Sequence, residues 1–141
     1  MPVFVDTNVL VYARDAAEPA KQAQARAWVE ELWRARSGRL SFQVLQEFYV
    51  TVTRKLVPGL TPTEARAEVR NLLAWRPAAV DAQMLEAAWS LQDRHSLSFW
   101  DALILSAARA TGCDRLLSED LSDGEVYDGV EVVSPFAHHP S

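Results

Sequence analysis

Two acidic residues follow short apolar segments that are typical of buried strands. Asp6 comes directly after Val3–Val5, and Asp120 follows the segment 115–118. Ligands of parallel sheets bind beyond the carboxyl ends of the strands, so the two carboxylates are predicted at one edge of a sheet. Carboxylate oxygens there could bind Mg²⁺ or Mn²⁺. Taken singly, either acid could also be a solvated loop residue or a helix cap.

Two further acids lie within predicted helices. Glu47 shares a helix face with Val44 and Thr51, beside the apolar stripe. It is therefore either a surface residue at the margin of that stripe or a carboxylate projected from a rigid helix into a cleft. Asp101 is the third helical residue after Ser98, which is the capping-box pattern. An acid at this position also interacts with the helix dipole by about 0.3–1 kcal/mol, so local structure alone can account for Asp101.

The elements that must position these acids alternate between helices and short apolar strands. A helical turn is predicted after Thr7, and longer helices are predicted over about 21–36, 43–56, 61–75, 81–95 and 98–112. Strands are predicted at 3–5, 115–118 and 130–133, and the segments 40–42 and 78–80 are further strand candidates. Gly38 is the predicted stop signal of the second helix. No linker divides the chain. Residues 1–141 are therefore predicted to form one α/β domain with a central parallel sheet, and the last residues, including His138 and His139, a flexible tail.

The composition is that of an ordinary globular protein, with 49% hydrophobic residues in 141. The chain has 14 Lys and Arg against 19 Asp and Glu, a formal net charge of −5. This balance excludes a broad basic face, so a polyanionic partner would need positive charge from another source, such as a divalent cation. Cys113 is the only cysteine, which fits a reducing cytoplasm. The N-terminus has no basic segment before its apolar residues, so neither a signal peptide nor a membrane span is expected.

Four acidic segments together are more specific than any one acid. They are VFVDTNVLVYA, LQEFYVTVTRK, SFWDALILSAA and LLSEDLSDG, in this order along the chain. With these segments the chain resembles the PIN-domain family, and within it the VapC-type toxins of toxin–antitoxin pairs. The segment GVEVVSPF is similar to the closing strand of that subfamily. The resemblance implies a three-layer α/β/α sandwich around a parallel sheet and the activity of a metal-dependent ribonuclease.

The resemblance also implies the residues of the site. The acids of the family fall on Asp6, Glu47, Asp101 and Asp120, which would be both catalytic residues and ligands of Mg²⁺ or Mn²⁺. The polar residue of the first motif falls on Asn8, and the hydroxyl residue before the last acid falls on Ser118. The last motif also contains Glu119 and Asp123. Of these three acids we favour Asp120.

The function implied by the resemblance is that of a cytoplasmic endoribonuclease, with RNA as its substrate and no membrane partner. A VapB-like antitoxin would pack its C-terminal segment on an apolar helical surface, and the toxin would be a homodimer. The apolar stripe of Trp28, Val29, Leu32 and Trp33 fits either a dimer interface or the core. Two alternatives remain at this stage: an interaction module without catalysis, whose acids are helix caps, and a nuclease that acts on DNA.

Overall fold

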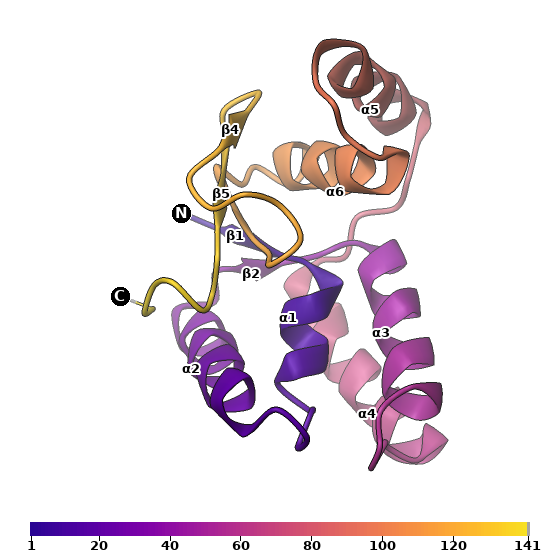
Figure 1. Ribbon diagram of the computed structural model, residues 1–141. Coiled ribbons are helices and arrows are strands. Elements are labelled where there is room, and N and C mark those ends of the chain that lie inside the picture. The colour runs from indigo at the N-terminus through magenta and orange to yellow at the C-terminus, as the bar shows by residue number, and fades with distance from the viewer. Residues whose placement is uncertain (141) are drawn as a thin grey trace.

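Five strands form one sheet in the computed structural model, which describes residues 1–140 (Figure 1). The sheet order is β2-β1-β3-β5-β4, with the strands at β1 (Val3–Val5), β2 (Gly38–Arg39), β3 (Arg115–Leu117), β4 (Val126–Tyr127) and β5 (Val130–Val133). β1 pairs in parallel with β2 and β3, β3 pairs in parallel with β5, and β4 is antiparallel to β5. The central sheet is therefore mostly parallel, as predicted, with one antiparallel edge strand in addition.

Helices cover the two faces of this sheet. They are α1 (Thr7–Tyr12), α2 (Pro19–Ala35), α3 (Phe42–Arg54), α4 (Pro62–Leu72) with the 3-10 turn η1 (Leu73–Trp75), α5 (Ala82–Arg94) and α6 (Phe99–Ala110). Figure 1 shows α1 to α4 on one side of the strands and α5 with α6 on the other. The predicted three-layer α/β/α sandwich is confirmed. No helix within residues 1–140 has the length and apolar character needed to cross a bilayer.

The core lies around the central strands. Phe4 and Val5 of β1 and Leu116 and Leu117 of β3 are fully buried. Strands that are apolar on both faces are expected where helices cover both sides of a parallel sheet. This burial fixes the backbone of β1 and β3, so the residues that directly follow these strands have fixed positions too.

The apolar stripe of α2 belongs mainly to the core. Trp28 and Leu32 are buried, whereas Trp33 is 39% exposed and packs against the ring of Trp75. The indole N–H of Trp28 donates to the carbonyl oxygens of Pro135 (3.1 Å) and His138 (3.0 Å). His138, which the sequence placed in a flexible tail, is thus held in the fold, and its Nε2 also lies 2.9 Å from Asp123 Oδ2. Ser141, the end of the predicted tail, lies outside the described residues.

Two local predictions need correction. Gly38 does not end α2; that helix ends at Ala35, and its C-cap residue Arg36 takes the left-handed conformation (φ 54°). Gly38 is instead a strand residue, and a Cβ there would come within 2.7 Å of the Trp75 ring, so the close approach requires glycine. The candidate strands at 40–42 and 78–80 provide only one isolated bridge, between Ser41 and Ala78.

The strand β4 was not predicted from the sequence. β4 and β5 are joined by the two-residue turn Asp128–Gly129, with φ values of 48° and 82°. Positive φ at both turn residues is the requirement of the tightest hairpins, and Asp-Gly is a preferred pair there. The turn dipeptide was therefore a usable signal for this hairpin.

Candidate active site

Asp6 lies at the carboxyl end of β1, where the sheet passes into helix α1. Its backbone N–H donates to the carbonyl of Leu117, which extends the pairing of β1 with β3. Its side chain caps α1 by accepting from the Thr7 N–H (2.7 Å) and also accepts from the Ser118 hydroxyl (2.7 Å). The residue is 6% exposed. Both carboxylate oxygens are thus fixed in direction by neighbours that belong to rigid elements.

A polar network joins Asp6 to the segment after β3. Parallel pairing of Val5 with Leu117 places Asp6 beside Ser118. The Asn8 side chain lies 3.4 Å from Asp6 and 3.5 Å from the Ser118 hydroxyl, and its carbonyl oxygen accepts from the Glu119 N–H (3.3 Å). The Ser118 hydroxyl in turn accepts from the Asp120 N–H (3.1 Å). The structure therefore brings Asn8 and Ser118 against Asp6 and ties the backbone of Asp120 to the same network.

Glu47 reaches this network from α3. The side chain is exposed, and its two oxygens accept from the Thr7 hydroxyl (2.7 Å) and from the Gln43 amide (2.9 Å). Neither Thr7 nor Gln43 was predicted from the sequence to belong to the site. Gln43 was recognisable because residues four apart on a helix are neighbours. The contact of Thr7 with Glu47 joins residues 40 positions apart and depends on how α1 packs against α3.

Asp101 lies in the first turn of α6, as the capping pattern predicts. Its N–H donates to the Ser98 hydroxyl at 3.1 Å. In the capping box of α4, by comparison, Glu64 also accepts from the backbone N–H of Thr61. Over residues 1–140 the Asp101 carboxylate accepts no hydrogen bond from the Ser98 backbone N–H. The start of α6 therefore has only one of the two hydrogen bonds of a capping box. The helix that carries Asp101 is otherwise buried from Ala102 to Ala108.

The three acids of the last motif have different surroundings. Glu119 forms an ion pair with Lys21 of α2 (2.5 Å). Asp123 accepts from the Ser134 N–H (2.8 Å) and contacts His138. Asp120 is exposed and is the one of the three whose charge acts on both Asp6 and Asp101. The preference for Asp120 as the acid of the site stays a prediction.

The acids influence each other electrostatically. The pKa of Asp6 is raised from 3.8 to about 6, mainly by burial and also by the charges of Asp120 and Glu47, against the hydrogen bonds from Ser118 and Thr7, which lower it. Burial also raises the pKa of Asp101, hydrogen bonding to Ser98 opposes the rise, and the charge of Asp120 adds to it. The charge of Asp120 thus acts on both Asp6 and Asp101, and the charge of Glu47 acts on Asp6.

The donor set fits a hard divalent cation. Within residues 1–140 no three acidic, histidine or cysteine side chains are close enough to enclose an ion on their own. This is compatible with Mg²⁺, which usually keeps several water ligands and takes only one or two carboxylates from the protein. A cation would also offset the repulsion that raises the carboxyl pKa values. The residues present thus fit Mg²⁺ or Mn²⁺.

The chain was compared with known families and structures. The PIN domain family model matches residues 3–122. The crystal structure of Mycobacterium tuberculosis VapC20, a toxin that cleaves the sarcin–ricin loop, is similar with a TM-score of 0.61 at 23% identity, covering 84% of this chain and 89% of that chain. A toxin–antitoxin complex from Klebsiella pneumoniae is similar with a TM-score of 0.66 at 18% identity, covering 96% and 98%. None of the curated proteins compared with the chain matches it significantly.

Proposed function

The chain belongs to the PIN-domain family, and from this premise we propose that it is a cytoplasmic, divalent-metal-dependent endoribonuclease, the toxin of a VapBC-type module. The observation that supports the proposal is the charge of Asp120, which helps to raise the pKa of both Asp6 and Asp101 although the three acids come from separate elements. Helix capping explains Asp101 and part of Asp6 but gives no reason for Asp120 to lie near both. The similarity to VapC20 favours RNA as the substrate.

Phosphodiester hydrolysis needs an in-line water and stabilisation of charge on the phosphate. A bound Mg²⁺ or Mn²⁺ supplies a Lewis acid for the phosphate oxygens and lowers the pKa of water. In our proposal Asp6, Asp101 and Asp120 hold the cation together with water, each carboxylate binding it either directly or through a water ligand. The Thr7 N–H and the Ser118 hydroxyl orient the Asp6 carboxylate, and Asn8 keeps Ser118 in place. Glu47 adds a fourth negative charge to the proposed site. Its Oε1 accepts from Gln43 and its Oε2 accepts from Thr7, which orients the carboxylate.

Cleavage of single-stranded RNA is the direct test of this function. We expect cleavage with millimolar Mg²⁺ or Mn²⁺ and none with a chelator. The metal should also raise the melting temperature, because a ligand present at 100 times its Kd stabilises the native state by about 2.7 kcal/mol. Asp6→Asn is the matched control, since it keeps the shape of the side chain but removes the charge.

Two other outcomes of this experiment would favour one of the alternative functions. Cleavage of single-stranded DNA at the rate of RNA or faster would favour a DNA nuclease. Neither cleavage nor a metal-dependent melting shift in a well-folded preparation would favour an interaction module without catalysis.

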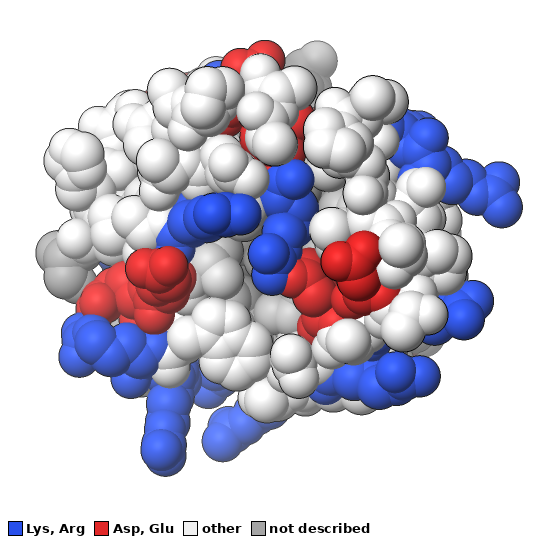
Figure 2. Space-filling view, turned by 90° about the horizontal axis from the view of Figure 1, so that it is seen from below, with Lys and Arg blue, Asp and Glu red and all other residues white. Residues whose placement is uncertain are grey.

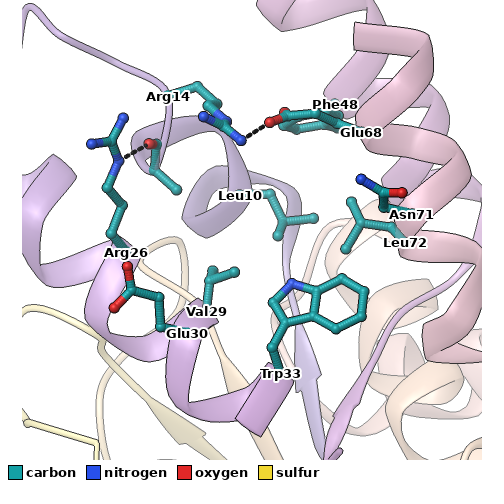
Figure 3. A pocket seen from close by; sticks show the side chains of 11 residues that line it. Leu10, Arg14, Arg26, Val29, Glu30, Trp33, Phe48, Glu68, Asn71 and Leu72 are labelled. Atoms are coloured by element: carbon teal, nitrogen blue, oxygen red, sulfur yellow. Dashed lines mark hydrogen bonds and ion pairs between the residues drawn. The ribbon is translucent and has the colours of Figure 1, made fainter. Parts of the chain in front are cut away.

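The antitoxin is expected on the helical side of the molecule. A cavity of about 440 Å³ opens between α1, α2, α3 and α4. Leu10, Val29, Phe48 and Leu72 are among the residues that line it, together with the ion pair of Arg14 with Glu68 (Figure 3). Figure 2, which views the molecule from below, shows acidic and basic side chains interspersed among uncharged residues, with neither sign continuous. We propose that the C-terminal segment of a VapB-like antitoxin packs its apolar side chains into this cavity. The similarity to a toxin–antitoxin complex supports such a partner.

Val29→Arg tests this surface. A charged side chain in the cavity should weaken antitoxin binding at least about 100-fold, because a buried and unpaired charge costs several kcal/mol, and it should leave RNA cleavage by the free toxin unchanged. Titration calorimetry with the product of an antitoxin-like reading frame, to be sought next to the gene, measures the affinity. Val69→Arg, in a separate apolar hollow between α3 and α4, is the control. Equal loss in both variants would contradict binding at the Val29 cavity.

A homodimer is the remaining part of the proposal. Exposed apolar side chains of Phe42, Leu73 and Trp89 provide surface that a second copy could cover. The dimer follows from the family resemblance, and these residues are compatible with it.

A further inference from the structure

The segment that follows β3 contains two adjacent acids, of which our proposal uses only the second. Glu119 and Asp120 are consecutive, so a small change in the backbone of this segment could exchange their positions. The backbone N–H groups of Glu119 and Asp120 donate to Asn8 Oδ1 and to the Ser118 hydroxyl, which holds the backbone of both residues. These hydrogen bonds do not hold the side chain of either acid. A contact to one of the two side chains would therefore decide which carboxylate stays available to Asp6.

Lys21 makes this contact. Its Nζ lies 2.5 Å from Glu119 Oε1, across 98 positions of sequence. The same Nζ lies 3.4 Å from the Tyr12 hydroxyl. It also lies over the rings of Tyr12 (4.8 Å to the centroid) and Phe136 (5.0 Å). One hydroxyl and two aromatic faces thus confine the ammonium group, which is more than an exposed ion pair normally has.

The position of Lys21 is fixed by the way α2 packs. Gln24 Nε2 lies 3.5 Å from the Phe136 carbonyl, and the Trp28 indole bonds the carbonyls of Pro135 and His138. Residues 21, 24 and 28 share one face of a helix. That face therefore holds the C-terminal segment, including the ring of Phe136, and the same segment limits where the Lys21 side chain can go.

We propose that Lys21 is a positioning residue of the nuclease site: it binds Glu119 against Tyr12 and Phe136 and so leaves Asp120 as the acid directed to Asp6 and Asp101. Lys21 acts through Glu119 and touches neither phosphate nor metal. This inference rests on the proposed function, because it concerns how that site is assembled.

Lys21→Met removes the charge but keeps much of the apolar stem. Partners outside the ligand set typically change metal affinity or activity about 10- to 100-fold when they are lost. We expect the Mn²⁺ concentration for half-maximal RNA cleavage, and that for the half-maximal rise in melting temperature, to increase by about this factor. The melting temperature without metal should fall by no more than about 3 °C, because a partly exposed ion pair contributes little to stability. Lys21→Arg should retain most of the metal affinity, because it keeps the charge.

The double variant separates positioning from direct contact. Glu119→Gln alone should act in the same direction as Lys21→Met. If Lys21 works through Glu119, adding Lys21→Met to Glu119→Gln should change neither the metal response nor the rate any further. Arg34→Met is the matched control, since Arg34 also forms an ion pair from α2, with Glu31, and lies outside the site.

Three results would overturn the inference while leaving the nuclease intact. One is an active wild type whose metal response is unaffected by Lys21→Met. Another is a further loss when Lys21→Met is added to Glu119→Gln, which would place Lys21 on the phosphate. The third is loss of all metal binding in Glu119→Gln with full binding in Asp120→Asn, which would make Glu119 the ligand. An inactive wild type that does not respond to metal would instead contradict the proposed function itself.

Discussion

Asp101→Asn should remain folded and lose RNA cleavage by at least about 100-fold, which corresponds to about 2.7 kcal/mol of transition-state stabilisation. The change keeps the size of the side chain and removes its charge. As a helix residue Asp101 contributes only about 0.3–1 kcal/mol through the dipole, so the melting temperature should fall by a few degrees at most. Thermal unfolding and cleavage rate should be measured on the same sample.

Asp81→Asn is the matched control for this experiment. Asp81 caps α5 by accepting from the Met84 N–H at 2.9 Å, so the variant removes an acid from a helix N-terminus without touching the acid cluster. It should lose a similar amount of stability and no activity. Near-normal cleavage by Asp101→Asn would leave Asp101 as a cap alone and would require a different set of acids.

Asp6→Asn should abolish cleavage and yet make the metal-free protein more stable at neutral pH. Burial raises the pKa of Asp6 from 3.8 to about 6, so its charged form is disfavoured in the fold. That difference corresponds to at most about 3 kcal/mol of lost stability at pH 7 and above. Asparagine has no charge to bury, and its side chain can still accept from the Thr7 N–H and contact the Ser118 hydroxyl.

The sign of the pH dependence follows from the direction of the pKa change. Below about pH 3.8 the carboxyl group is protonated in both folded and unfolded chains, so it has no such effect on stability. Between pH 3.8 and about 6 the unfolded chain loses the proton first, and the stability of the wild type falls as pH rises. The stability advantage of Asp6→Asn should therefore be smallest near pH 4 and reach its maximum above pH 6.

Denaturant unfolding at pH 4, 6 and 8 measures this difference, with Asp93→Asn, an exposed acid of α5, as the control. Millimolar Mg²⁺ or Mn²⁺ should reverse the order of stability at pH 8, because only the wild type keeps the full ligand set. Parallel pH profiles for wild type and Asp6→Asn would contradict the account of a buried, uncompensated carboxylate.

Elements with a local signal could be predicted from the sequence. The start of α4 follows from Thr61 and Glu64, and both bonds of their capping box are present. The start of α6 follows from Ser98 in the same way. β1 and β3 follow from short apolar segments, because strands that are buried on both faces carry no polar alternation. In each case the residues that determine the element are contiguous.

Elements of two residues could not be predicted by periodicity. β2 at Gly38–Arg39 is too short to show a pattern, and Gly38 was interpreted as a helix stop because its contact with Trp75 is invisible in the sequence. β4 could have been found from the turn dipeptide that follows it. Here tertiary contact decides the structure, and single-sequence patterns contain little of that information.

Some contacts of the candidate site could likewise be predicted from the sequence, and others could not. The proximity of Asp6 and Ser118 could be predicted, since both follow strands of a parallel sheet. The pairing of Lys21 with Glu119 could not, because it depends on how α2 packs against a segment far along the chain. The catalytic roles of Asp6, Glu47, Asp101 and Asp120 remain predictions that the variants above are designed to test.

The two edges of the sheet bear on how copies of this protein can associate. β2 and β4 are the edge strands, and each is only two residues long. An edge strand recruits another chain through its row of unpaired N–H and C=O groups, and short edges offer very few of them. Strand addition between molecules, the route to cross-β aggregates, therefore has almost no template here. Ordered association must therefore use side-chain surfaces on the helices. Such surfaces can select one partner, whereas the unpaired backbone groups of a strand edge bind any other strand.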